Sequence, residues 1–185
     1  MSEVELEMAL RADVKAAFPM LVETYQDALY RFGLRLTGNS HDAEEVAQDA
    51  FVRAFRWLLA NSPPGEGQLK AWLYQVTLNV FRNRVRKPKL PTAALDAAEL
   101  VRGDDGLEPA TAAAAAETRA ELAQVLSRLP LRYREAVVLR HVEDLTYPEM
   151  AAVLARPEGT VKSDVHRGLG LLRAALAETR EEVLV

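Results

Sequence analysis

The chain has 185 residues and a formal net charge of −4, with 23 lysines and arginines against 27 aspartates and glutamates. This length suffices for one or two small domains with hydrophobic cores. The slight negative charge excludes a protein that coats nucleic acid by bulk positive charge, and the absence of cysteine excludes disulfides and thiolate metal sites. No apolar run approaches the ~20 residues that span a bilayer, and the acidic start is unlike a signal peptide, so we expect a cytoplasmic protein without membrane insertion.

Helix-forming residues dominate the sequence, isoleucine is absent and Gly-containing hairpin turns are scarce. We therefore predict an all-α fold. After a short frayed start, apolar residues recur on one helical face over residues 18–36, and Gly38 ends this first helix. Asn39 or Ser40 caps a second helix over residues 41–59.

The next segment, NSPPGEGQ at residues 61–68, is a loop because its two prolines and two glycines break a helix. A third helix over residues 69–89 follows and runs out into a basic end. Its apolar side chains form one buried stripe, namely Leu69, Trp72, Leu73, Val76 and Val80. Three helices of this length can close a core, so we place a first helical domain at residues 12–89.

The exposed face of the 69–89 helix carries a second stripe at steps of three or four residues. Amides and guanidinium groups share it, namely Gln75, Asn79, Asn83 and Arg86, with Arg82 beside them. Amides can donate to and accept from a base edge, whereas arginine and lysine hold phosphates. The stripe therefore indicates binding of nucleic acid. The alternative is an ordinary solvated face, since charged faces are the rule on surface helices.

Residues 90–116 are rich in proline, alanine, glycine and acid, and the sequence predicts a flexible acidic linker there. A second helical domain follows at residues 117–180. In it, Thr146 caps a short helix, ARPEG turns the chain, and a longer helix over residues 160–176 carries polar and basic residues in its first two turns. This is the helix-turn-helix arrangement, whose second helix can enter a major groove. An ordinary helical hairpin is the alternative.

Two helical domains in this order, with HDAEEVAQDAFVRAFRWL and WLYQVTLN in the first and EGTVKSDVHRGLGLLR in the second, resemble the extracytoplasmic-function sigma factors of bacterial RNA polymerase, in the sigma-70 family. The resemblance covers nearly the whole chain. It implies a transcription initiation factor whose partners are promoter DNA and core RNA polymerase, bound at the β′ coiled coil and the β flap. It also implies an anti-sigma factor as a regulator.

The resemblance assigns roles to three sets of residues. The set that docks on the β′ coiled coil is Glu45, Gln48, Asp49 and Arg53. The set that melts and holds the −10 element, with Asn79 and Asn83 around an unpaired base, is Gln75, Asn79, Arg82, Asn83, Arg84, Arg86 and Lys87. The set that reads the −35 element is Glu158, Thr160, Lys162, Ser163, Asp164 and Arg167.

The sequence departs from the family pattern in two places. The loop at residues 61–68 lacks the usual aromatic and basic residues, which leaves the captured base open. Asp164 stands where a basic residue is common, and Gly168 and Gly170 interrupt a stretch usually rich in arginine. Each glycine inside a helix costs roughly 0.5–1 kcal/mol against alanine. We therefore expect weak −35 binding by the isolated second domain, although Asp164 can accept from cytosine N4.

Other classes of function would require different features in the sequence. The three histidines are scattered, no nucleophile sits beside a base and no phosphate-cradling loop follows a strand, so we expect no catalytic, cofactor or metal site and no enzyme. A conventional helix-turn-helix regulator would bind intact duplex as a dimer without polymerase. A helical adaptor that binds only proteins would not need the basic end at residues 82–89.

Overall fold

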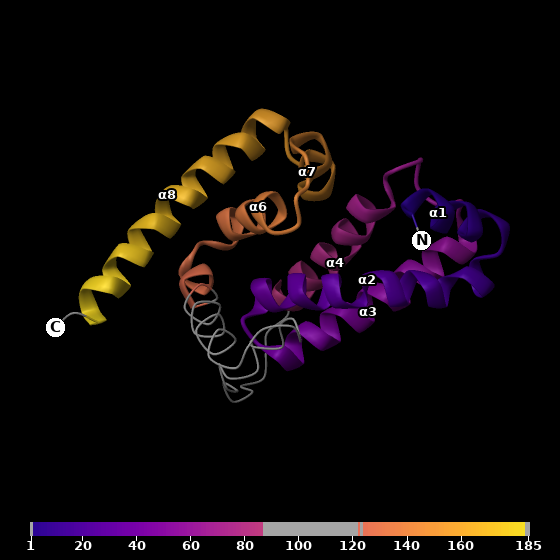
Figure 1. Ribbon diagram of the computed structural model, residues 1–185, viewed down its shortest axis with the longest axis horizontal. Helices are drawn as coiled ribbons and strands as arrows, with labels where there is room; N and C mark the ends of the chain where they lie inside the picture. The colour runs from indigo at the N-terminus through magenta and orange to yellow at the C-terminus, as the bar shows by residue number, and fades with distance from the viewer. Residues whose placement is uncertain (1, 87–121, 123, 184–185) are drawn as a thin grey trace.

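The computed structural model describes residues 2–86, 122 and 124–183, and all regular structure in this part of the chain is helical (Figure 1). The predicted all-α class is confirmed. The predicted linker at residues 90–116 and the domain boundaries that flank it lie outside the described residues. No helix in the described part is long and apolar enough to cross a membrane.

The first unit consists of four helices: α1 (Glu3–Ala12), α2 (Val14–Thr37), α3 (Ser40–Ala60) and α4 (Leu69–Arg86). Local sequence sets their ends. The side chain of Asp13 accepts from backbone N–H groups in the first turn of α2, and Gly38 ends that helix with a φ of 69°. Asn39 caps α3 by accepting from the N–H of Asp42. The predicted helices at residues 18–36 and 41–59 are thus found as α2 and α3.

The expected frayed start is wrong, because residues 3–12 form α1. Ser2 and Glu5 make a reciprocal capping box at its first turn. Leu6 and Leu10, one helical turn apart, are each 1% exposed and belong to the core. This helix therefore packs with the first unit, and the first-domain boundary expected at residue 12 leaves it out.

The core of the first unit lies between α2, α3 and α4. Phe32 of α2 meets Tyr74 of α4 edge to face, with ring centroids 5.0 Å apart. Gly33 lets α2 approach α3 closely, because an added Cβ would lie 3.2 Å from the carbonyl oxygen of Ala43. In the predicted stripe of α4, Leu69, Leu73 and Val80 are buried, whereas Trp72 and Val76 are half-buried.

The second unit holds α6 (Leu131–His141), α7 (Tyr147–Leu154) and α8 (Glu158–Val183), preceded by helical residues 124–128. Thr146 caps α7 in a capping box with Glu149, and Ala155 turns the chain with a left-handed φ of 52°. The second helix of the predicted helix-turn-helix begins two residues before Thr160 and continues past Leu176. The short helix, turn and longer helix are therefore present as predicted.

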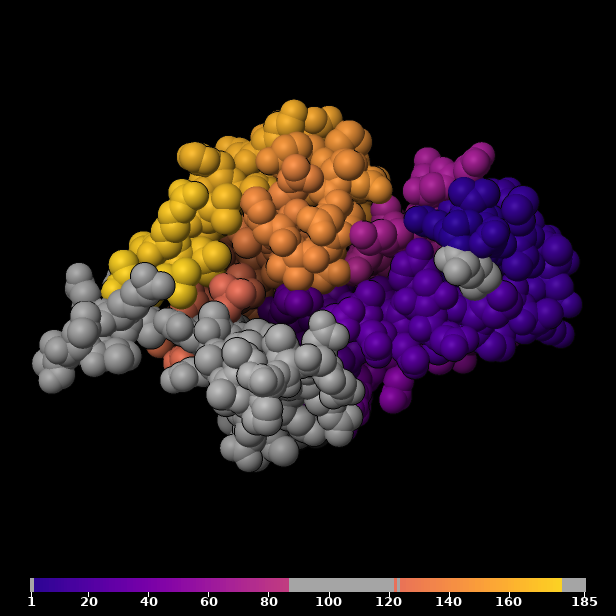
Figure 2. All heavy atoms as spheres, in the orientation of Figure 1, coloured from indigo at the N-terminus to yellow at the C-terminus, as the bar shows by residue number. Residues whose placement is uncertain are grey.

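The two units pack against each other, which the sequence left open. Helix α7 lies against α4, and α6 lies against the end of α2 (Figures 1 and 2). In Figure 2 the orange second unit rests directly on the violet and magenta first unit. This packing brings residues of α4 into contact with residues far along the chain.

Candidate nucleic-acid interface

The predicted amide stripe lies on a face of α4 that the second unit partly covers. Asn79 is exposed, while Gln75 and Asn83 are half-buried. Arg86 Nη2 donates to Asn83 Oδ1 at 2.8 Å, one helical turn apart. Asn79 is thus the amide of this stripe that is most open to a base.

Arg82 is bound by the second unit. Its Nε and Nη2 donate to the two carboxylate oxygens of Glu135 on α6, at 2.9 and 2.6 Å. Glu135 is only 1% exposed, and its Oε2 also accepts from Arg156 at 3.0 Å. The guanidinium binds this carboxylate with the same two-pronged geometry that it uses for a phosphate. Arg82 is therefore already paired with a carboxylate in this structure.

Gln75 is also engaged by the second unit, because its Nε2 donates to the carbonyl oxygen of Ala152 on α7 at 2.9 Å. Arg84 turns the other way and pairs with two carboxylates of α3. It donates to Asp49 at 2.8 Å and forms a short ion pair with Glu45. These groups are part-exposed, so the pairs are weakly stabilising.

The residues predicted to dock on polymerase share one side of α3. Gln48 and Arg53 are exposed, whereas Glu45 and Asp49 carry the pairs with Arg84. Residues assigned to polymerase and to DNA are therefore adjacent on neighbouring helices. Lys87, the last residue of the predicted −10 set, lies outside the described residues.

A second buried carboxylate, Glu143, lies between the units and was not foreseen from the sequence. It is 8% exposed, and its side chain accepts from Tyr74 Oη at 2.5 Å and from Arg35 Nη1 at 3.2 Å. Its backbone carbonyl accepts from Lys70 Nζ at 2.8 Å. Burial raises the pKa of Glu143 above its ordinary value, although these donors oppose the shift.

Burial, and then the adjacent Glu143, raise the pKa of Tyr74, so its hydroxyl keeps the proton that it donates. The acids that were missed share a signal. Glu135 directly precedes the apolar run of residues 136–139 on α6, and Glu143 follows two residues after the end of that helix. An acid so close to an apolar run is liable to be buried and then needs a partner. The sequence cannot say which residues supply that partner.

Most of the predicted −35 set lies on the outside of the first turns of α8. Glu158, Lys162, Ser163 and Arg167 are exposed and Thr160 is half-buried. Lys162 pairs with Glu158 at 2.7 Å, and its Nζ lies 5.3 Å from the ring centroid of Tyr147. This surface can therefore present polar and basic groups to a groove.

Asp164 is an exception and requires a correction, because its side chain points inward. It is 1% exposed, and its carboxylate accepts from Arg132 at 2.9 Å and from Arg156 at 3.2 Å. The expectation that Asp164 faces a cytosine is therefore not met in this structure. The Asp164 carboxylate instead links α8 to Arg132 at the start of α6 and to Arg156 in the turn before α8. These two ion pairs explain an acidic residue at a position where a basic residue is common.

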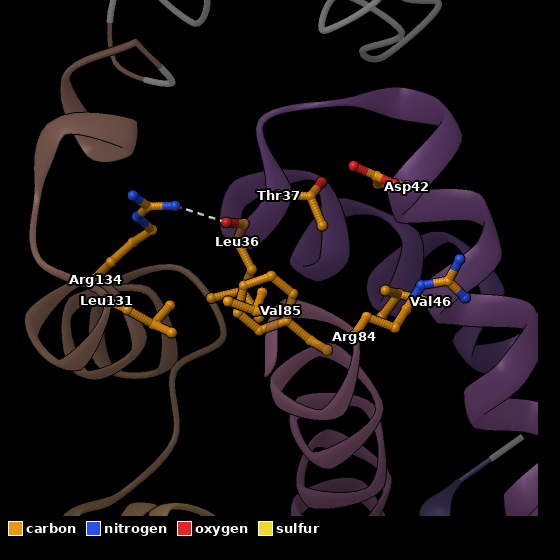
Figure 3. A pocket seen from close by; sticks show the side chains of 9 residues that line it. Leu36, Thr37, Asp42, Val46, Arg84, Val85, Leu131 and Arg134 are labelled. Atoms are coloured by element: carbon orange, nitrogen blue, oxygen red, sulfur yellow. Dashed lines mark hydrogen bonds between the residues drawn. The ribbon is translucent and has the colours of Figure 1, made fainter. Parts of the chain in front are cut away.

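A cavity of about 270 Å³ lies where the two units meet, at the ends of α2 and α4 (Figure 3). Figure 3 shows Leu131 and Arg134 on the side of the second unit and the remaining labelled residues on the side of the first, with Arg134 donating to the carbonyl oxygen of Leu36 at 2.6 Å. Its lining is Leu36, Thr37, Asp42, Val46, Phe81, Arg84, Val85, Leu131 and Arg134. Apolar packing between the units is therefore incomplete here.

A helix-turn-helix unit, joined to a helical bundle with an amide and arginine face, defines a helical DNA-binding protein. Comparison with known families makes this more specific. The Sigma-70 region 2 family matches residues 21–89, and the Sigma-70, region 4 family matches residues 119–172. The match to region 2 begins after α1, so this helix lies outside both matched ranges.

Similar proteins extend the match over most of the chain. The ECF RNA polymerase sigma factor SigW of Bacillus subtilis is 32% identical over 191 residues, covering 94% of this chain and 100% of that protein. The ECF RNA polymerase sigma factor SigE of Mycolicibacterium smegmatis is 36% identical over 177 residues, covering 91% of this chain and 66% of that protein. The chain belongs to the extracytoplasmic-function sigma factors of the sigma-70 family.

A solved structure supports the arrangement of the two units. CnrH, in complex with the cytosolic domain of CnrY, matches with a TM-score of 0.69 and 26% sequence identity, covering 95% of this chain and 97% of that one. The match spans both helical units, so CnrH has a similar overall fold.

Proposed function

We propose that this chain directs core RNA polymerase to specific promoters, opening the −10 element with α4 and reading the −35 element with α8. The observation that carries the proposal is the outer face of α4, where exposed Asn79 stands in line with two further amides and with Arg86. Family membership supports the same function and does not favour the alternative of a dimeric regulator that acts without polymerase.

The chemistry of this face suits a melted strand. Taking a base out of the stack costs a few kcal/mol, so the protein must hydrogen-bond the extracted base and hold the backbone of its strand. Asn79 and Asn83 are one helical turn apart and can donate to and accept from one base. Arg82, Arg84 and Arg86, at the end of α4, are proposed to hold phosphates once Arg82 and Arg84 exchange their carboxylate partners for DNA, and each such contact adds salt dependence.

The other two surfaces follow the same logic. The exposed face of α3 with Gln48 and Arg53 is proposed to dock on the β′ coiled coil, together with Glu45 and Asp49. The outer face of α8 is proposed to enter the major groove at the −35 element through Thr160, Lys162, Ser163 and Arg167. A protein regulator such as an anti-sigma factor is part of the proposal, and the similar CnrH structure, which holds the cytosolic domain of CnrY, supports it.

Transcription in vitro with purified core polymerase tests the function. Wild type, Asn79→Ala, Asn83→Ala and the control Gln26→Ala, an exposed amide on α2, are compared on a library of promoter fragments and on the same library with a pre-melted bubble. We expect core-dependent initiation at a subset of fragments. The two α4 variants should lose roughly tenfold on duplex, because a good base contact contributes ~1–3 kcal/mol, and should partly recover on the bubble.

Tight binding to duplex without polymerase, and no initiation with it, would instead establish the conventional regulator. Equal activity of all four proteins on duplex would remove Asn79 and Asn83 from the site while leaving the sigma-factor function in place.

A further inference from the structure

We propose that the second unit and the single strand of the −10 element compete for the same face of α4, and that the packed arrangement is a closed state held by Glu135 and Glu143. This inference rests on the proposed role of α4 in binding that strand. It adds a regulatory equilibrium within the chain itself. In the closed state Arg82 and Gln75 are bonded to α6 and α7, so a strand can reach them only after the units separate.

Glu135 binds the guanidinium of Arg82 in the way that a DNA phosphate would. Both of its oxygens accept from the guanidinium, in an almost fully buried site. When the units separate, Glu135 keeps a partner within its own unit, because Arg156 also donates to it at 3.0 Å. Separation therefore leaves Glu135 with a partner in the second unit. It also releases Arg82 of α4 from Glu135, so that its guanidinium can bind a phosphate.

Glu143 is held differently, because the side chains that donate hydrogen bonds to it belong to the first unit. Tyr74 and Arg35 donate to its carboxylate, and Lys70 donates to its carbonyl oxygen. All these bonds are lost on separation and replaced by water. A change at this site therefore acts on the closed state and leaves the separated units largely as they were.

The character of the interface suits an equilibrium. Directional bonds join the units at Glu135, Glu143, Ala152 and Leu36, while the cavity at the ends of α2 and α4 leaves apolar packing incomplete. Bonds of this kind exchange for water or for DNA phosphates at modest net cost, whereas a fully packed apolar interface would not.

The competition has a quantitative form. If only a fraction of molecules is open, the apparent association constant for the strand is the intrinsic constant multiplied by that fraction. By thermodynamic linkage, binding of the strand must then shift the equilibrium between packed and separated units towards separation by the same factor. Removing a hydrogen bond to a buried charge should change the equilibrium by about tenfold or more.

Spin labels on the full-length protein measure the separation of the units. The chain has no cysteine, so Gln26→Cys on α2 and Ala174→Cys on α8, both exposed, accept labels at defined places. The DNA probe is a fluorescent pool of single-stranded 12-mers randomised at every position, at one fixed salt concentration. Two changes open the closed state from opposite sides: Glu143→Ala from the second unit, and Tyr74→Phe, which keeps the ring against Phe32, from the first.

We expect both variants to broaden the label separation towards longer distances and to bind the pool several-fold to tenfold more tightly. The pool should lengthen the separation in the wild type as well. Glu23→Ala, which removes the same charge as Glu143→Ala from an exposed site on α2, controls for the change in net charge. Thermal unfolding of each variant verifies that the units themselves remain folded.

Two results would overturn the inference: separations in Glu143→Ala and Tyr74→Phe equal to those of the wild type, or affinities for the pool no higher than that of Glu23→Ala. Either result is distinguishable from failure of the proposed function, which would appear as absence of polymerase-dependent initiation by the wild-type protein.

Discussion

Gly168 and Gly170 lie two residues apart on α8 and have different surroundings. A Cβ at Gly168 would lie 2.5 Å from Val137 Cγ2 and 3.1 Å from the carbonyl oxygen of Tyr133, whereas a Cβ at Gly170 would have nothing within 4 Å. The sequence suggested that both are costs to the helix. The structure shows that Gly168 is required for the close crossing of α8 and α6, because the stiff, β-branched Val137 has little freedom to move aside.

Alanine at each glycine should therefore have opposite effects. Gly170→Ala is expected to raise the free energy of unfolding by ~0.5–1 kcal/mol through helix propensity. Gly168→Ala is expected to lower it by about 1–3 kcal/mol, since overpacking outweighs that gain. Urea unfolding followed by circular dichroism measures both. Equal stability of the two variants would show that the crossing relaxes without cost.

At the scale of elements, α1 supports the first turn of α4. The Glu7 carboxylate, 2% exposed, accepts from the N–H of Gly67 at 3.0 Å and from the N–H of Leu69 at 3.3 Å. Glu3 accepts from the N–H of Lys70 at 2.9 Å, and Arg11 donates to the carbonyl oxygen of Pro64 at 3.0 Å. The backbone groups that a helix N-terminus leaves unpaired are thus satisfied by another helix.

Removing the charge of Glu7 should lower the stability of the first unit. Glu7→Gln keeps the shape but provides one neutral acceptor oxygen where two charged ones stood, and bonds to a charged group contribute ~1.5–3 kcal/mol. We expect a loss of roughly 1–2 kcal/mol in the free energy of unfolding. Glu23→Gln, exposed on α2, is the matched control and should be nearly neutral. If Glu7→Gln proves as stable as this control, the cap is dispensable and hydration replaces it.

At the scale of the whole molecule, the packing of the two units should depend on pH. Burial of Glu143 raises its pKa above the ordinary value of 4.5, and the opposing effects of Tyr74, Arg35, Lys70 and Arg31 are smaller. Packing of the units therefore takes up a proton. The contribution of this group to the packed state is fully present below its ordinary pKa of 4.5 and is lost as the pH rises through the raised pKa.

Label separations between Gln26→Cys and Ala174→Cys, measured as the pH rises above 4.5, test this dependence. We expect the open population to grow with pH in the wild type and to change less in Glu143→Gln, which keeps an acceptor for Tyr74 but cannot titrate. Circular dichroism at each pH excludes acid unfolding. An identical pH dependence in both proteins would assign the effect to other groups.

Local sequence patterns determined where the helices of this protein begin and end. The capping residues Asn39 and Thr146, the stop at Gly38 and the apolar period of α2 and α4 act within one or two helical turns, so they could be predicted before any fold was known. The family resemblance likewise depended on contiguous motifs, and the family matches confirm it. The frayed start was mispredicted although the capping box of Ser2 and Glu5 was within reach of the same rules.

Only the tertiary structure decided what the charged residues do. Arg82 and Glu135 are 53 residues apart in sequence, Tyr74 and Glu143 are 69 apart, and Asp164 turns inward to arginines from two other segments. The position of a residue in a helix predicts the face on which its side chain lies, but it does not predict which distant group packs against that face. The sequence by itself therefore determined the helices, their caps and the family, whereas the packing of two separate units determined which residues of α4 are open and which are held, because charge pairing depends on distances that no local pattern encodes.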